Sequence, residues 1–296
     1  GIILSTLIGL LIGIARLSNN YLIAKLAGGY IELFRNIPIL LQILFWYNLF
    51  INVFPHPKQS LAFFDIAFLN QRGLYLPKPI PEDGFLFVTL AFIIGIIAAY
   101  FIKKFFKKKH ELTGAHTSTW PYTLGLVIGF PVIVYFLIGS PLQFDYAVLG
   151  KFNLKGGMAV VPEFLALTFA LSVYTATYIA EAIRSGIEAV DKGQKEAAAA
   201  IGLSPIQSLK LIVLPQALRV AIPPTINQYL NLTKNSSLAT VIGYPELMST
   251  FGGTVLNQVG QAVEILAMAM LVYLVISLFI SLLLNYVNKK MEIQGR

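Results

Sequence analysis

The sequence contains no cysteine, and only 12% of its 296 residues are charged. Without cysteine there is no disulfide framework, no thiol chemistry and no cysteine-ligated metal site. Soluble domains carry about 25% charged residues, so an ordinary soluble domain is excluded. No G-x-x-x-x-G-K-S/T phosphate loop occurs, and the chain therefore lacks the nucleotide site of a P-loop ATPase. We also predict no catalytic site and no metal site, because His56, His110 and His116 fall in expected loops without metal-ligand spacing.

Long apolar segments are abundant. Hydrophobic residues make up 56% of the chain, and the mean hydropathy is +0.72. A helix needs about 20 apolar residues to cross a bilayer, and six segments approach that length: 31–54, 85–102, 121–139, 162–183, 208–232 and 262–287. Residues 1–15 are apolar but slightly short and begin without methionine, so we expect a first span truncated at its N-terminus rather than a signal peptide. The expected fold is all-α: a polytopic transmembrane helical bundle of about seven spans, in a single domain over residues 1–296.

Basic residues indicate the orientation of the spans, since cytoplasmic loops are enriched in Lys and Arg. Sixteen of the 22 basic residues fall in one alternate set of loops, at 16–35, 103–109, 184–219 and 289–296. We therefore place these loops and the C-terminus in the cytoplasm. The same bias explains the net charge of +8 without a nucleic-acid partner, and the lysine run at 103–109 is expected to be a stop-transfer flank. The loop at 55–84 is expected outside, with 61–69 along the membrane interface.

The stretch KEAAAAIGLSPIQSLKLIVLP, at 195–215, differs from the apolar segments around it. Its alanine-rich start predicts a short helix, and Gly202 stands where a helix stop favours positive φ. Ser204 is a predicted N-cap with Pro205 at the first helical position, and Gln207 completes a capping box. Pro215 is expected to kink the following helix. The pattern indicates either a rigid lever that transmits a push into the bilayer or an ordinary helical loop.

The same stretch resembles the EAA loop of ABC-importer permeases. The matching residues, at both family spacings, are Glu196, Ala197, Ala198, Gly202, Ile212, Leu214 and Pro215. The resemblance implies that residues 188–211 form a cytoplasmic coupling loop, whose helix docks in a cleft on a separate ATPase subunit. Glu196 would pack against the ATPase, and Gly202 would make the turn. Ala197, Ala198, Ser204 and Pro205 complete the expected ATPase-coupling set.

The resemblance extends along most of the chain. The sequence is similar to polar amino acid permeases, and most of all to their general L-amino acid subtype. It is carried by YIELFRNIPILLQ (30–42), AEAIRSGIEAVDKGQKEAA (180–198), LPQALRVAIPPTINQYLNLTKNSSLATVIGYPEL (214–247) and GGTVLNQVGQAVE (252–264). Residues 31–54 and 162–287 would be the core spans, and 55–160 extra spans and loops. The implied partners are an ATP-binding subunit dimer that holds ATP and Mg²⁺, a second, paralogous permease, and an extracytoplasmic amino-acid-binding protein, all at the inner membrane. No cofactor is expected on this chain.

Polar residues in or beside spans are costly and therefore indicate a substrate path. The candidates are Glu163, Asn231, Lys234, Asn235, Ser236 and Ser237. Glu181 with Arg184, and Glu32 with Arg35, are spaced to pair on one helix face instead. Two other functions remain as alternatives: an ion-coupled secondary transporter that uses membrane carboxylates such as Glu163 or Glu264, and a membrane scaffold that only recruits a partner.

Overall fold

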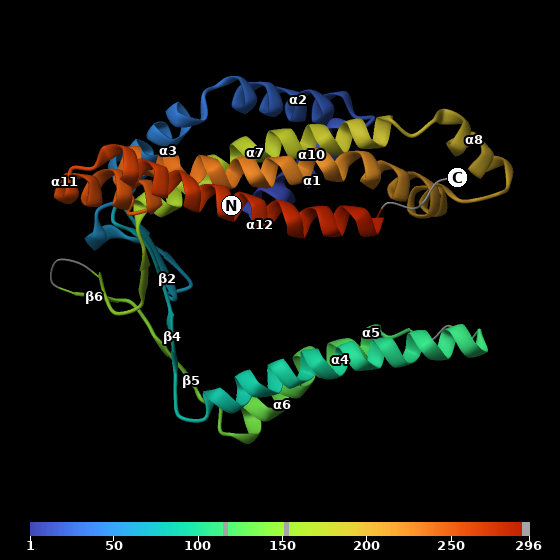
Figure 1. The fold of residues 1–296 in the computed structure, drawn as a ribbon, viewed down its shortest axis with the longest axis horizontal. Helices are drawn as coiled ribbons and strands as arrows, with labels where there is room; N and C mark the ends of the chain where they lie inside the picture. Colours follow the sequence, from blue (N-terminus) through green and yellow to red (C-terminus); the bar gives the residue numbers. More distant parts are fainter. Residues whose placement is uncertain (115–117, 151–153, 292–296) are drawn as a thin grey trace. The chain divides into compact units, whose positions relative to one another are not determined.

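The structure is a computed structural model that describes residues 1–114, 118–150 and 154–291. His116 and residues 292–296 of the expected cytoplasmic C-terminus lie outside the described residues. Most of the described chain is helical (Figure 1). The helices are α1 (Ile2–Arg16), α2 (Tyr21–Asn36), α3 (Ile39–Val53), α4 (Phe85–Thr113), α5 (Trp120–Leu124), α6 (Phe130–Leu137), α7 (Pro162–Glu188), α8 (Lys192–Ala200), α9 (Pro205–Ser208), α10 (Leu214–Asn235), α11 (Leu256–Val259) and α12 (Ala262–Met291).

Short strands depart from the all-α expectation. They are β1 (Leu61–Phe63), β2 (Ala67–Asn70), β3 (Gly73–Leu76), β4 (Lys78–Pro81), β5 (Leu142–Asp145), β6 (Val148–Leu149), β7 (Leu154–Lys155) and β8 (Met158–Val160). They form a sheet of order β1-β2-β3-β8 and the pairs β4-β5 and β6-β7. Segment 61–69 supplies β1 and most of β2, with Phe64 and Asp65 at positive φ between them. Its location along the membrane interface stays a prediction.

Seven spans are not confirmed. Within the described residues, five helical stretches are long and apolar enough to cross a membrane: Phe85–Leu112, Trp120–Leu137, Pro162–Glu188, Pro205–Ile242 and Ala262–Tyr286. A sixth arises if α2 and α3 count as one broken span. Helix α1 is apolar but only 15 residues long.

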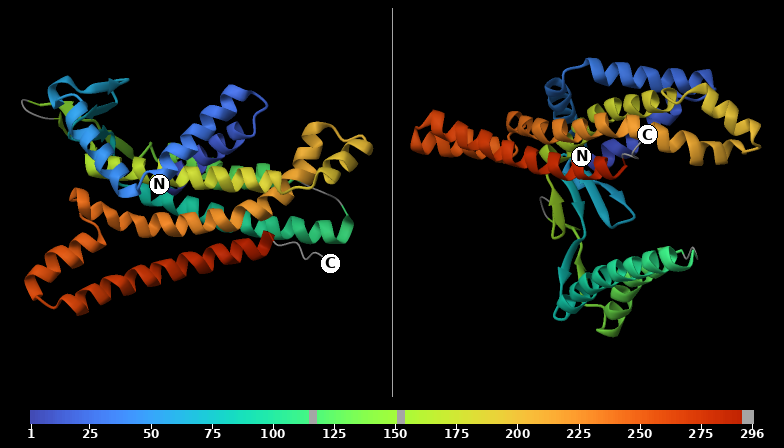
Figure 2. Two further views of the ribbon diagram at one scale, coloured as in Figure 1. Left: turned by 90° about the horizontal axis from the view of Figure 1, so that it is seen from above. Right: turned by 45° about the vertical axis from the view of Figure 1, so that its right-hand side comes forward.

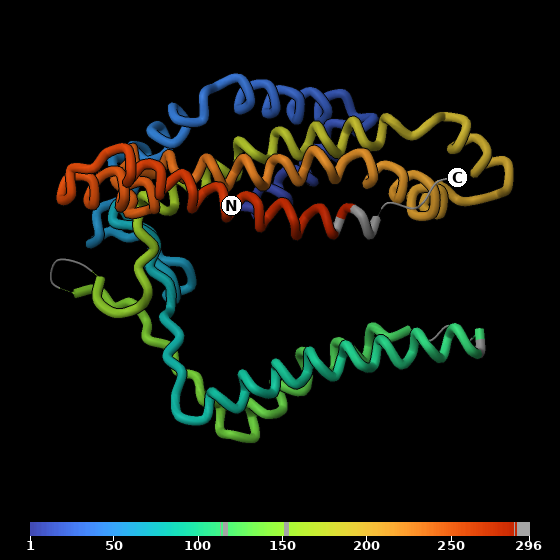
Figure 3. The backbone as a smooth tube through the Cα atoms, in the orientation of Figure 1, coloured from blue at the N-terminus to red at the C-terminus, as the bar shows by residue number. Residues whose placement is uncertain are grey.

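The expected single helix over 31–54 is wrong. Helix α2 ends at Asn36, and α3 begins at Ile39 after a bend of 102° (Figure 3). Pro38 disfavours helical backbone at the preceding residue, and Ile37 is extended, with φ −91° and ψ 129°. The hydrophobic run continues through this break, so apolar length alone did not reveal it.

The chain divides into two compact units, each described here by itself. Unit 1 comprises Gly1–Gln59, Leu69–Leu74 and Val160–Arg296. Its central helix is α7, which packs against α1, α10, α3 and α2. Figures 1 and 2 show α7 and α10 side by side over much of their length. Because α7 is enclosed by other helices, it carries more buried residues than any other helix of this unit in the described part of the chain.

Small residues bring α1 and α7 close together. The buried residues of α1 are Ser5, Gly9 and Gly13, spaced four apart on one face. A Cβ added at Gly9 would lie 2.8 Å from the side chain of Ile179 and 3.0 Å from the carbonyl oxygen of Ala176. This small-residue spacing is typical of close helix packing in membranes.

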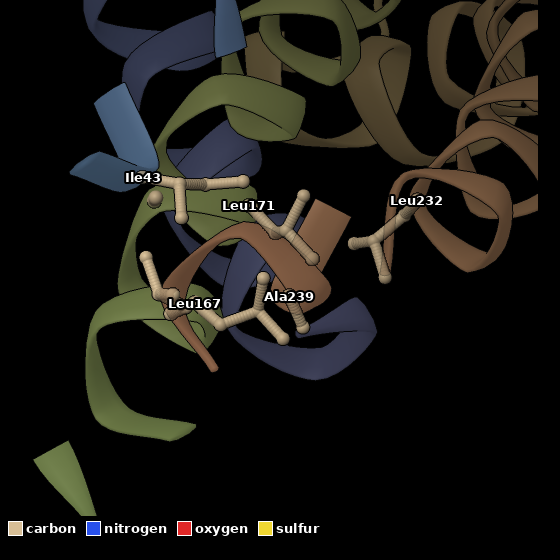
Figure 4. Close-up of a cluster of buried hydrophobic side chains, with 7 residues drawn as sticks. Ile43, Leu167, Leu171, Leu232 and Ala239 are labelled. Atoms are coloured by element: carbon tan, nitrogen blue, oxygen red, sulfur yellow. The ribbon is translucent and has the colours of Figure 1, made fainter. Parts of the chain in front are cut away.

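A hydrophobic cluster forms around the N-terminal half of α7. Ile43 from α3, Leu167 and Leu171 from α7, Leu232 from α10 and Ala239 point toward one another (Figure 4). Ala170 and Ile242 complete the buried set. The cluster packs the C-terminal half of α10 against the N-terminal half of α7.

Unit 2 comprises Ser60–Phe68 and Tyr75–Ala159. Helix α4 packs against α5, the π-helical turn Gly125–Gly129 and α6. A side chain at Gly95 would collide with the carbonyl group of Leu126, so glycine permits this close approach. Strands β4 and β5 pair antiparallel in the register Lys78 to Asp145 and Pro81 to Leu142.

Candidate functional site

The loop between α7 and α10 begins with a capped helix. Asp191 is the N-cap of α8, and its side chain accepts a hydrogen bond from the backbone N–H of Gly193 at 2.6 Å. The helix ends before Gly202, which has φ +79°. The N–H of Gly202 donates to Ala199 and that of Leu203 to Ala198, at 3.0 and 3.1 Å. These bonds satisfy carbonyl groups at the helix end, and glycine adopts the required φ without strain.

The predicted capping box is present. The Ser204 hydroxyl accepts from the backbone N–H of Gln207 at 3.4 Å, and the Ser204 N–H donates to Gln207 Oε1 at 2.9 Å. Pro205 occupies the first position of α9. A π-helical turn over Leu209–Val213 then leads into α10. Pro215 follows that turn, in the first turn of α10. The kink expected at Pro215 stays a prediction.

The base of this loop is packed against unit 1. Val190 at the end of α7 is buried with Val213 and Ala217, and Ile187 packs against them. A Cβ at Gly186 would meet the carbonyl oxygen of Ala217 at 2.6 Å. The end of α7 and the start of α10 are therefore held in direct contact where the loop leaves them.

The expected coupling residues divide into two groups. Glu196, Ala197, Gly202, Ser204 and Pro205 are exposed, together with the apolar side chains of Ile201 and Ile206. Ala198 is only 1% exposed. Ala198 therefore packs within its own chain, whereas the exposed residues form a surface that a partner could contact.

The expected substrate-path residues do not gather in one site. Asn231 and Lys234 are exposed. The hydroxyls of Ser236 and Ser237 donate to the carbonyl oxygens of Thr233 and Lys234, at 2.7 and 2.8 Å, and so serve their own helix turn. Asn235 is half-buried.

Glu163 lies at the start of α7. Its carboxylate accepts a hydrogen bond from the hydroxyl of Tyr47 on α3, at 3.2 Å. None of the six expected path residues lines either of two cavities in unit 1.

One of these two cavities is polar and has a volume of about 490 Å³. Its charged and amide side chains come from α1, α2 and α7: Arg16, Glu32, Arg35, Asn36, Glu181 and Arg184. The expected Glu181–Arg184 pair forms, and Arg184 also pairs with Glu188. The expected Glu32–Arg35 pair does not: in the described part of the chain, no ion pair within 4.0 Å includes either residue.

The second cavity, of about 820 Å³, is lined mostly by apolar residues of α1, α7 and α10. The hydroxyls of Thr6 and Tyr229, two residues of its lining, are hydrogen-bonded at 2.7 Å. It offers no charged group to a substrate.

Sequence reasoning missed a half-buried hydrogen-bond network around Glu246. This carboxylate accepts from the Thr240 hydroxyl, from the backbone N–H groups of Met248 and Ser249 at 2.8 and 2.7 Å, and from the Tyr273 hydroxyl at 2.9 Å. Through Tyr273, this network links α12 to the segment around Glu246 that precedes it. An acidic residue just before the helical turn 249–255 was the available signal.

Residues 91–293 match the family described as "Binding-protein-dependent transport system inner membrane component". The chain is 50% identical over 295 residues to the putative amino-acid ABC transporter permease protein YhdX of Escherichia coli, covering 100% of this chain and 75% of that protein. It is also 50% identical over 296 residues to the general L-amino acid transport system permease protein AapQ of Rhizobium johnstonii, covering 100% of this chain and 74% of that protein.

A crystal structure of an amino acid ABC transporter with histidines shares the fold, with a TM-score of 0.55 and 20% identity over 98% of this chain and 86% of that one. At 20% identity this similarity shows a shared fold and nothing more. Both relatives are named as permeases of amino acid transport systems, and neither supports the alternative of an ion-coupled carrier. The chain belongs to the family of binding-protein-dependent transport system inner membrane components, and it is a membrane permease subunit, not an enzyme, whose ATPase is a separate subunit.

Proposed function

We propose that this permease carries L-amino acids across the inner membrane as part of an ABC importer. The observation that carries the proposal is 50% identity along the whole chain to a permease named for general L-amino acid transport. The partners would be an ATP-binding subunit dimer, which holds ATP and Mg²⁺, and an extracytoplasmic amino-acid-binding protein. A second permease, paralogous to this one, would complete the pore.

The loop at 188–211 would couple the ATPase to the spans. Glu196, Ala197, Gly202, Ser204 and Pro205 are exposed, and Ala198 would hold α8 on its own chain. Because Val190 and Val213 pack together at the base of the loop, a displacement of α8 would move α7 and α10 as a pair. Closing of the ATPase dimer on ATP would then change access to the pathway from one side of the membrane to the other.

Residues at the far end of α10 would contribute to the pathway. An amino-acid zwitterion needs hydrogen-bond donors for its carboxylate and an acceptor for its ammonium group. Lys234 is exposed, and Asn231, Asn235, Ser236 and Ser237 lie nearby on the same helical stretch. Glu163 would be the acceptor.

The orientation remains part of the proposal. With the basic loops inside, the loop at 188–211 and the C-terminus face the cytoplasm. Residues 31–54 and 162–287 would form the transport core, and 55–160 would be an insertion specific to longer permeases. The helical loop at 188–211 would then contact the ATPase directly.

Affinity purification of a tagged chain from its native membrane, followed by mass spectrometry and reconstitution in liposomes, tests the proposal. We expect an ATPase and a second permease to copurify, and amino-acid uptake to require ATP inside the liposomes and the loaded binding protein outside. Uptake by this chain alone, abolished by an ionophore and indifferent to ATP, would contradict the proposal. Recovery of a homodimer would correct only the identity of the second permease.

A further inference from the structure

Some of the charged side chains that line the polar cavity between α1, α2 and α7 form no short ion pair in the described structure. Arg184 is matched by two carboxylates, those of Glu181 and Glu188. Glu32 and Arg35 form no ion pair within 4.0 Å in the described structure, although both line the cavity. A carboxylate and a guanidinium therefore face the same space without binding each other.

Contacts with other helices hold Arg35 and Arg16, two of the cavity's arginines, in place. Arg35 lies over the ring of Tyr178 on α7, with 5.1 Å between its guanidinium carbon and the ring centroid. Arg16 donates to the carbonyl oxygen of Ala24 at 3.2 Å, and its guanidinium lies against Gly28, where an added Cβ would approach it to 3.0 Å. Contacts with neighbouring helices thus orient both arginines before any ligand arrives.

The position of Glu32 and Arg35 adds a second argument. Both residues are exposed on α2, which together with α3 forms a broken candidate span. An ionisable side chain in a span almost always faces a water-filled cavity or the interior of the protein assembly, since exposure to lipid is costly. The exposed face of α2 that borders the cavity therefore faces water rather than lipid.

We propose that the polar cavity is a second subsite for the α-amino and α-carboxylate groups of the transported amino acid, separate from the pathway residues around Lys234 and Glu163. This inference rests on the proposed function. Arg35 donates to the α-carboxylate, a planar acceptor that suits a guanidinium. Glu32 accepts from the α-ammonium group. The two residues are one helical turn apart, a spacing that puts side chains on the same face about 5–6 Å apart at Cβ, and an α-amino acid carries its two charges on one carbon.

The size and charge of the cavity fit this ligand class. A volume of about 490 Å³ lies within the range of about 300–1,000 Å³ found for small-molecule sites. A subsite that binds only the α-amino and α-carboxylate groups, which all α-amino acids share, does not discriminate between their side chains. Such a subsite suits a permease of broad specificity, with selection among amino acids made elsewhere.

Equilibrium binding of tritiated L-glutamine to the purified permease–ATPase complex, without the binding protein, tests the proposal. Arg35→Gln and Glu32→Gln should each weaken binding by roughly tenfold to a hundredfold, the loss expected for a hydrogen bond to a charged group. Arg35→Lys should restore part of the affinity, since it keeps the charge but not the planar fork. In the wild-type complex, 4-aminobutanamide, which lacks the α-carboxylate, and glutaramate, which lacks the α-amino group, should both compete poorly.

Lys25→Gln is the matched control, because Lys25 is an exposed base on the same helix that does not line the cavity and lies 3.1 Å from the Tyr21 hydroxyl. It should bind L-glutamine as the wild type does. Wild-type affinity in Arg35→Gln and Glu32→Gln would overturn the subsite. Loss of the second permease from both variants on purification would also overturn it, since the charges would then serve an interface. Failure of the proposed function looks different: the wild-type complex would transport no amino acid.

Discussion

Replacement of Gly202 tests whether the turn after α8 transmits force. The φ of +79° at this position lies in the left-handed region, and no atom lies within 4 Å of an added Cβ. The effect of a side chain is therefore backbone strain rather than a clash, about 1–2 kcal/mol for an ordinary L-residue. Strain of this size changes the population of the native turn by a factor of roughly 5–30.

The backbone preference of the new residue sets the order of effects. Asn tolerates left-handed backbone, Ala less so, and a β-branched residue least. In reconstituted importer we expect amino acid carried per ATP hydrolysed to fall in the order Gly202→Asn, Gly202→Ala, Gly202→Val, or the ATPase to dissociate in the last variant. The spans should keep their thermal stability, because the turn lies outside the hydrophobic clusters around α7.

Gly29→Ala is the matched control. Gly29 is helical and exposed, and an added Cβ there also meets nothing within 4 Å, so alanine should be neutral or slightly stabilising. Equal coupling in Gly202→Val and the wild type would refute the reasoning. An equal loss in Gly29→Ala would show that the assay reports on any glycine replacement.

Four further changes test other parts of the structure. Glu196→Lys reverses an exposed charge on α8 and should uncouple or release the ATPase without lowering the melting temperature of the permease; normal ATP-driven uptake would argue against a contact there. Lys234→Ala should reduce uptake while the complex still assembles, and wild-type uptake rates would remove Lys234 from the pathway. Gly9→Val places atoms against Ile179 and the Ala176 carbonyl group and should destabilise the fold by about 1–3 kcal/mol, seen as a lower melting temperature in detergent. Glu246→Gln leaves one amide oxygen for four donors and should lower the melting temperature more than Tyr273→Phe, which removes a single donor; an equal shift would mean that Tyr273 is the main partner.

The local chemistry of the coupling loop was predictable from sequence because it depends on neighbours in the chain. The Gly202 turn and the Ser204–Gln207 capping box use residues within five positions of one another. Apolar length likewise located α4, α7 and α12, since a span must be long and hydrophobic whatever its partners. The broken span at Ile37–Pro38 required a local signal, the proline, to be weighed against an apolar run that continues past it.

The polar cavity could not be predicted in the same way, because its residues are distant in sequence. The spacing of Glu32 and Arg35 suggested a pair on one helix face, and this spacing would favour pairing on an isolated helix. In the folded chain Arg35 lies over Tyr178 instead, and α7 brings Glu181 and Arg184 to the same cavity. A tertiary contact thus separates two charges that the sequence would join. Separated charges of opposite sign in a membrane protein are costly unless a ligand, a partner or water compensates them, and for this reason the failed pairing is more informative about function than a confirmed pairing would have been.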